Sequence, residues 1–111
     1  MNTEALLFKA LSDPTRLRIA ALLAMKGDVC VCYLAGALEA QDFKISRHLG
    51  ILRAAGIVEA RREGTWMHYK LASPRSEFEK RLFDCLRRYL KEHPTVKADL
   101  KRLSSACCAV R

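Results

Sequence analysis

Cysteine spacing is the first chemical feature of this 111-residue chain, because four of its five cysteines occur as two close pairs. Cys30 and Cys32 are separated by one residue, and Cys107 and Cys108 are adjacent. An odd number of cysteines does not predict a disulfide framework in such a chain, so reduced thiols are expected. Soft thiolates suit trivalent arsenic or antimony, cadmium or lead better than magnesium or calcium. We therefore predict that both pairs are metal or metalloid ligands, or redox groups.

Each pair also has a purely structural interpretation. Cys30 and Cys32 can be small apolar residues of the core, and the pair at 107–108 can belong to an unstructured end. If the second pair is functional, it either forms a separate site or completes the first one. Cys85 lies in an apolar stripe and is expected in the core. The histidines lack partners at ligand spacing, so no zinc site is predicted around them.

A second chemical feature is the basic segment at residues 41–53. Ile45, Leu49 and Leu52 recur at i, i+4 and i+7, which places them on one face of a helix. The other faces are polar and basic, as in a helix that enters the major groove of DNA. An ordinary amphipathic surface helix is the alternative. The residues of this helix expected to contact DNA are Lys44, Ser46, Arg47 and His48.

The distribution of charge supports a polyanion-binding surface. The net charge is +8, with a pI near 9.6. Residues 1–40 hold four basic and four acidic residues, residues 41–70 hold six and three, and residues 71–111 hold ten and five. Positive charge therefore begins where the basic helix begins. The excess in the last segment can also serve solubility alone.

The elements around these residues are predicted as a series of helices interrupted by one hairpin. Helices are expected near residues 3–11, 14–25, 29–38, 41–53, 76–90 and 96–103. Asp13 and Asp28 are the expected caps of the second and third helices, and Ser76 with Glu79 forms a capping box. Strands at 57–62 and 65–71 form a hairpin, whose tip carries the candidate phosphate ligands Arg61 and Arg62.

This order predicts a mainly α fold, a winged helix-turn-helix with about six helices and a two-stranded β-hairpin wing. Residues 1–111 are expected to form a single DNA-binding domain. The first helix and residues 76–103 carry more apolar surface than one small core needs. We therefore expect a two-fold homodimer, which places two recognition helices about one DNA turn apart on an inverted repeat.

The motifs of the chain resemble those of the ArsR/SmtB repressors. The matching stretches are residues 11–19, 29–35, 44–49, 52–58 and 61–71. The resemblance implies a dimeric transcriptional repressor, not an enzyme, that leaves its operator when a thiophilic metal or metalloid binds. The Cys-Val-Cys element resembles the arsenite-sensing branch, which usually reads Cys-Val-Cys-Asp-Leu-Cys. Here Tyr33 and Ala35 stand in place of the Asp and the third Cys.

The predicted inducer is therefore a trivalent metalloid, most simply arsenic as arsenite or methylarsenite, or antimony as antimonite, and no permanent cofactor is expected. Residues i and i+2 of an intact helix lie about 200° apart, so binding at both Cys30 and Cys32 is expected to unwind the first turn of their helix. The alternatives are a cadmium or lead sensor, a redox or persulfide sensor, and, from another class, a thiol enzyme or metal buffer. With no signal peptide or membrane span in the sequence, a cytoplasmic location is expected.

Overall fold

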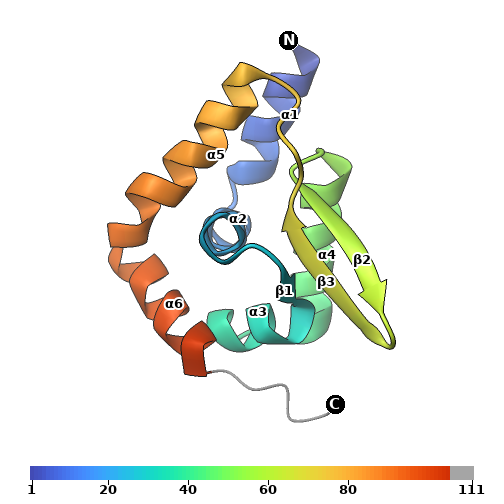
Figure 1. Ribbon diagram of the computed structural model, residues 1–111, viewed down its shortest axis with the longest axis vertical. Helices are drawn as coiled ribbons and strands as arrows, with labels where there is room; N and C mark the ends of the chain where they lie inside the picture. Colours follow the sequence, from blue (N-terminus) through green and yellow to red (C-terminus); the bar gives the residue numbers. More distant parts are fainter. Residues whose placement is uncertain (106–111) are drawn as a thin grey trace.

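Six α-helices and a small antiparallel sheet make up residues 1–105, the part of the chain that the computed structural model describes (Figure 1). The cysteine pair predicted at 107–108 lies outside these residues. The elements are α1 (Asn2–Leu11), α2 (Pro14–Lys26), β1 (Val29–Cys30), α3 (Val31–Leu38), α4 (Asp42–Ala54), β2 (Val58–Glu63), β3 (Trp66–Leu71), α5 (Glu77–Tyr89), the 3₁₀ turn η1 (Leu90–Glu92) and α6 (Pro94–Ser105). The predicted mainly α, winged helix-turn-helix fold is confirmed.

The core is built around α2, which runs through the middle of the molecule in Figure 1. Five consecutive α2 residues, 19–23, are buried, so this helix is enclosed on every side rather than on one face. As predicted, its start is capped by Asp13, whose carboxylate accepts a hydrogen bond from the Arg16 backbone N–H at 3.1 Å. Its end lies at Gly27, whose φ of 81° suits a residue without a Cβ. None of the helices in residues 1–105 has the length and apolar character to cross a membrane.

The sheet has three strands in the order β1-β3-β2, where the sequence predicted a two-stranded hairpin. Val29 pairs with Tyr69 and Cys30 with His68. The predicted helix at 29–38 is therefore wrong at its start, because Val29 and Cys30 are extended and α3 begins at Val31. The open edge of β3 offers backbone hydrogen bonds to this segment. Asp28 is not the cap of α3, because its carboxylate binds the wing instead.

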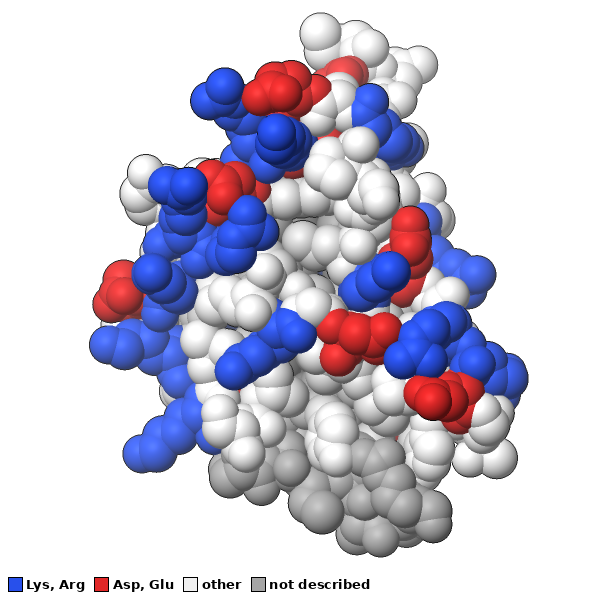
Figure 2. Space-filling model, in the orientation of Figure 1, with Lys and Arg blue, Asp and Glu red and all other residues white. Residues whose placement is uncertain are grey.

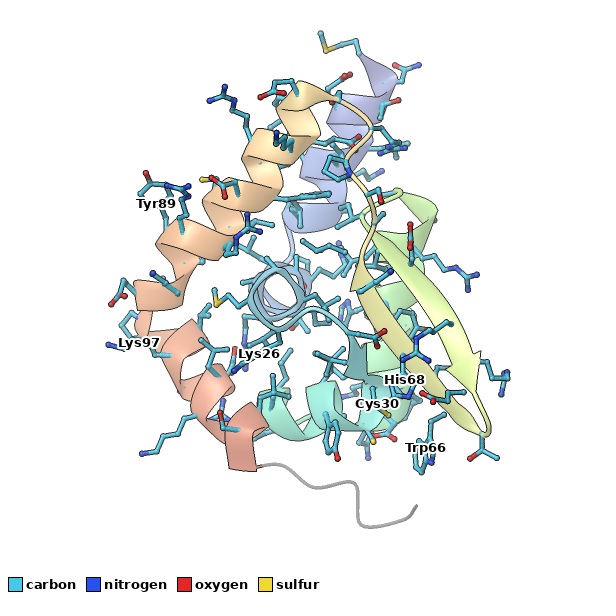
Figure 3. The ribbon with its side chains drawn as sticks, viewed as in Figure 1. Lys26, Cys30, Trp66, His68, Tyr89 and Lys97 are labelled. Atoms are coloured by element: carbon cyan, nitrogen blue, oxygen red, sulfur yellow. The ribbon has the colours of Figure 1, made fainter. Side chains whose placement is uncertain are left out.

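The packing face of α5 also differs from the prediction. Its buried residues are Glu79, Phe83 and Leu86, whereas three members of the predicted stripe, Phe78, Cys85 and Tyr89, are exposed. Cys85 is thus not a core residue. Tyr89 is 71% exposed and projects from α5 away from the rest of the chain (Figure 3). The cause is that α5 packs on α2 through the face adjacent to the predicted one.

Exposed apolar side chains from α1 continue this outer face. Leu6 and Phe8 are 52% and 54% exposed. The rings of Phe8 and Phe78 meet edge to face, with centroids 5.8 Å apart. A single copy of the chain therefore leaves apolar surface uncovered on α1 and α5, the two elements for which the sequence predicted a surplus.

An ion-pair network that the sequence did not predict attaches α6 to the core. Asp99 is fully buried and accepts hydrogen bonds from Arg18 at 2.7 and 2.8 Å and from Arg102 at 2.7 Å. The hydrogen bond with Asp99 raises the pKa of the Arg18 guanidinium. Arg102 also donates to the Ala37 carbonyl at 2.6 Å. The network therefore connects α6 to α2 and to α3, the helix that carries Cys32.

Replacing Asp99 by Ala is expected to lower the free energy of unfolding by about 3 kcal/mol, because the half-buried guanidiniums of Arg18 and Arg102 lose their buried anion. Urea denaturation followed by circular dichroism measures this. The control is Asp84→Ala, which removes a carboxylate paired with Arg87 and Arg88 on the surface of α5. That change is expected to cost less than about 1 kcal/mol. Equal losses in the two variants would contradict the role given to Asp99.

Candidate DNA interface and thiol site

The basic helix of the sequence is α4, and its apolar face is buried as predicted. Ile45, Leu49 and Leu52 have no exposed surface. The side chains on the opposite side, Lys44, Ser46 and Arg47, are exposed. The apolar stripe therefore fixes α4 to the core and directs its basic face outward, as a helix that reads the major groove requires.

His48 lies at the edge of this face and also contacts the start of α2. Its Nδ1 atom is 3.3 Å from a guanidinium nitrogen of Arg16 and 4.0 Å from a carboxylate oxygen of Asp13. Arg16 in turn donates to the Ala10 carbonyl at 2.7 Å. Sequence reasoning assigned His48 to DNA and missed Arg16, although both residues lie in segments it singled out. The contact of His48 with DNA stays a prediction, and its contact with α2 positions the recognition helix.

The carboxyl end of α4 is held by a clamp from the segment before α5. Arg75 donates to the Ala55 carbonyl at 3.2 Å, and its guanidinium lies against Gly56, where a Cβ would come within 2.7 Å of it. Glu79 holds Arg75 through its carboxylate. Burial raises the pKa of Glu79, but the hydrogen bonds from Arg75 outweigh it and leave the pKa below its usual value. The end of the recognition helix is thus linked to α5.

The two arginines predicted at the wing have different surroundings. Arg61 donates to Asp28 at 2.9 Å and to Glu63 at 3.0 Å. These two hydrogen bonds, the one with Glu63 first, raise the pKa of Arg61. Arg62 is exposed and has no ion-pair partner within residues 1–105. Arg62 is therefore the freer of the two to meet a phosphate.

Ion pairing separates the arginines of residues 1–105 into two groups. Those of α5 are paired with acidic residues of the same helix, and Figure 2 shows basic and acidic side chains interleaved over this helix. In the described part of the chain, the arginines with neither a hydrogen-bond nor an ion-pair partner are Arg47, Arg53 and Arg62. All three lie on α4 and β2, the two elements assigned to DNA.

The cysteines at the head of α3 lie together in a way that the sequence did not predict. Cys30 ends β1 and occupies the N-cap position of α3, with extended backbone angles of φ −69° and ψ 144°. Its Sγ atom is 3.1 Å from the Sγ atom of Cys32. The expected unwinding of a helical turn is therefore wrong, because Cys30 lies before the helix and the bend there already brings the two sulfurs together.

The surroundings of Cys30 connect the thiol pair to the wing and to α6. Cys30 is 1% exposed and pairs across the sheet with His68, and the two side chains lie near each other in Figure 3. Both residues line a cavity of about 300 Å³ that is also bordered by Asp28, Tyr33 and the end of α6. Asp28 contacts the wing through Arg61 at 2.9 Å, and its other oxygen lies 3.5 Å from the His68 ring.

Within the described residues, Cys30 and Cys32 bring two sulfur atoms side by side. Within residues 1–105, no group of three or more histidine, cysteine or acidic side chains is arranged to hold a metal ion. Cys107 and Cys108 lie outside these residues, so the structure does not place them relative to Cys30 and Cys32.

Comparisons with known proteins agree with this architecture. The family model described as "Bacterial regulatory protein, arsR family" matches residues 13–60. The arsenic resistance transcriptional regulator ArsR1 of Pseudomonas putida is 51% identical over 69 residues, which are 62% of this chain and 54% of that protein. The arsenical resistance operon repressor of Escherichia coli strain K12 is 38% identical over 103 residues, 93% of this chain and 86% of that protein.

A solved structure extends the agreement to the fold. The homodimeric winged helix-turn-helix DNA-binding domain from Mycobacterium bovis, determined by solution NMR, has a TM-score of 0.66 and 38% identity. The match covers 77% of this chain and 75% of that one. The chain therefore belongs to the ArsR family of bacterial regulatory proteins and is a DNA-binding transcriptional repressor with a winged helix-turn-helix.

Proposed function

We propose that this repressor acts as a homodimer and leaves its operator when trivalent arsenic binds to Cys30 and Cys32. The observation that carries the proposal is the 3.1 Å separation of the two sulfurs at the head of α3, because two cysteines this close can hold one soft ion when both are reduced to thiolates. Two relatives support it, since the Pseudomonas putida and Escherichia coli proteins are both named for arsenic resistance.

The sulfur separation favours a pyramidal ion over a tetrahedral one. Zinc bonds to thiolate at about 2.3 Å. For an ion at that distance from two sulfurs 3.1 Å apart, the sulfur–ion–sulfur angle is about 85°. Trivalent arsenic and antimony carry a lone pair, so their three bonds are close to right angles. A tetrahedral ion such as zinc needs about 109°, which would require the sulfurs to separate by roughly 0.6 Å.

Operator binding by the dimer is assigned to α4 and the wing. Lys44, Ser46, Arg47 and His48 contact base edges or nearby phosphates from α4, and Arg61 and Arg62 contact phosphates from β2. The exposed apolar side chains of α1 and α5 form the dimer interface, in keeping with the homodimeric Mycobacterium bovis domain. Two-fold symmetry then places the two recognition helices on an inverted repeat.

The route from the thiols to DNA begins at the junction of β1 and α3. An ion bound to both sulfurs pulls on Cys30, the last residue of β1, and on Cys32, in the first turn of α3. Movement of β1 acts on β3 through the pairing with His68 and on β2 through the ion pair of Asp28 with Arg61. Movement of α3 acts directly on α4, against which it packs. Because coupling is reciprocal, operator binding must weaken inducer binding equally, by about 1–3 kcal/mol.

The cysteine pair at 107–108 is proposed to determine whether the site responds better to arsenite or to methylarsenite. Arsenite has three valences for thiolates, whereas Cys30 and Cys32 supply two, with Ala35 in place of a third cysteine. Methylarsenite has two open valences, so one cysteine pair satisfies it. We assign Cys107 or Cys108 as the third ligand for arsenite.

Replacing Arg47 by Ala is expected to weaken operator binding by about 1–3 kcal/mol, because a guanidinium on the recognition helix is suited to a guanine edge. Replacing Arg62 by Ala is expected to weaken binding to all sequences and to lower the salt slope by about 1. Fluorescence anisotropy across a range of salt concentrations measures both. The control is Arg81→Ala, which removes an exposed arginine paired with Glu77 on α5 and should change neither quantity. Unchanged operator affinity in Arg47→Ala would contradict the assignment of α4 as the helix that reads DNA.

Replacing Cys30 by Ser is expected to leave operator binding intact and to abolish release by arsenite, because serine keeps most of the volume but is not a soft ligand. The measurement is operator release against added arsenite, with Cys85→Ser on α5 as the control. A second arm uses Asp28→Asn, which keeps both thiols but loses the ion pair with Arg61. That variant should bind arsenic with unchanged stoichiometry and release DNA less completely. Release of the Cys30→Ser variant at parental arsenite concentrations would refute this site, and release by peroxide instead would favour a redox sensor.

Replacing both Cys107 and Cys108 by Ser is expected to weaken the response to arsenite more than the response to methylarsenite, because only arsenite needs a third thiolate. Operator release and the ratio of bound arsenic to protein are measured for each compound. If mutant and parent respond equally to both, these two cysteines have no part in sensing. If both responses are lost, they form the primary site.

A further inference from the structure

An exposed aromatic ring lies at the start of the recognition helix, where DNA-contacting helices place their base-reading residues. Phe43 is the second residue of α4 and is 56% exposed. Its neighbours one turn along the helix, Ser46 and Arg47, are polar or charged, and Ile51, two turns along, is the other large exposed apolar residue of α4. The Phe43 ring is therefore not part of the core-facing stripe. Burying such a ring on binding is favourable, which makes Phe43 a contact residue for whatever α4 binds.

The Phe43 ring is paired with Arg47, one turn further along α4. The guanidinium carbon of Arg47 lies over the ring, 5.9 Å from its centroid. This distance is within the range of a cation–π interaction. Arg47 has no ion-pair partner within residues 1–105, so the ring is the described group that orients its guanidinium. Phe43 and Arg47 therefore form a preorganised pair, one member apolar and the other a hydrogen-bond donor.

The outer side of α4 beyond this pair is open. At Gly50 an added Cβ would meet no atom within 4 Å, so no other part of residues 1–105 covers the helix there. The exposed apolar residues of the other elements, Leu6, Phe8, Phe78 and Tyr89, lie on α1 and α5. Phe43 lies instead beside Lys44 and Arg47, on the basic surface already assigned to DNA. Its position is therefore continuous with the DNA interface and favours a base as its partner.

We propose that Phe43 determines specificity, by placing its ring against the 5-methyl group of a thymine in the major groove and by holding Arg47 toward the neighbouring base. The thymine methyl is the apolar group that the major groove presents, and phenylalanine is among the side chains that contact it. The guanidinium of Arg47 donates to acceptors such as O6 and N7 of guanine. The proposal rests on operator binding through α4.

The test compares thymine with deoxyuridine, which lacks only the 5-methyl group. Duplexes that bind the full-length protein are first selected from random sequence, separately with the parent and with Phe43→Ala. Each thymine of the parent's selected site is then replaced in turn by deoxyuridine. Loss of one methyl contact is expected to weaken parental binding about fourfold at one position in each half-site. In Phe43→Ala the same replacement should have no effect, and the thymine preference should be missing from its selected sites.

Controls separate this role from a general loss of affinity. Phe78→Ala removes another exposed phenylalanine, on α5, and should retain the full deoxyuridine effect even if overall affinity falls. Arg47→Ala should lose guanine discrimination at the neighbouring position and keep the effect of deoxyuridine. The proposal is overturned if the parent is insensitive to deoxyuridine at every position, or if Phe43→Ala keeps the parental sensitivity. If Arg47→Ala also binds normally, the failure lies in the assignment of α4 to DNA rather than in Phe43.

Discussion

The pairing of β1 with β3 is the interaction that brings the sulfurs of Cys30 and Cys32 together. Two residues, Val29 and Cys30, join the edge of the hairpin, and this extended segment must turn at Cys30 to enter α3. The turn brings two cysteines that are one residue apart onto the same side, whereas a continuous helix would point them apart. The same pairing makes Cys30 a neighbour of the wing. One short strand therefore both sets the approach of the two sulfurs and connects them to the wing.

The arginines show how one residue type serves two purposes in a basic protein. Arg18 and Arg75 have buried carboxylate partners and hold elements together, since a guanidinium fork matches a carboxylate. Arg47 and Arg62 lack such partners in the described part of the chain and lie on the outer surface of α4 and the wing. Total charge does not separate these groups, because it counts both equally. The groups are separated by whether each guanidinium has a carboxylate partner. By this criterion a small set of arginines is left without one in the described residues.

Local patterns were sufficient to predict the helices, the wing and the recognition helix, because capping, periodicity and turn residues act over a few positions. The features that the sequence did not predict depend on distant contacts. Cys30 becomes extended because β3, almost forty residues later, offers it an edge. Tyr89 faces outward because α2 takes the adjacent face of α5. In the sequence, Asp99 is indistinguishable from the other charged residues of a surface helix, because its partner Arg18 is 81 positions away. The closeness of Cys30 and Cys32 along the chain was therefore plain from the sequence, but the geometry of their sulfurs was not.

The contact between Arg16 and His48 has a consequence for the proton of the imidazole ring. A guanidinium can only donate hydrogen bonds, so the Nδ1 atom that it approaches at 3.3 Å must accept. In the neutral ring the single N–H is then on Nε2. The Nε2 atom of His48 is then a hydrogen-bond donor. Its partner must be an acceptor, such as a phosphate oxygen or a purine N7, and not an amino group. An arginine at the start of α2 thus selects the tautomer that a neutral His48 presents at the edge of α4.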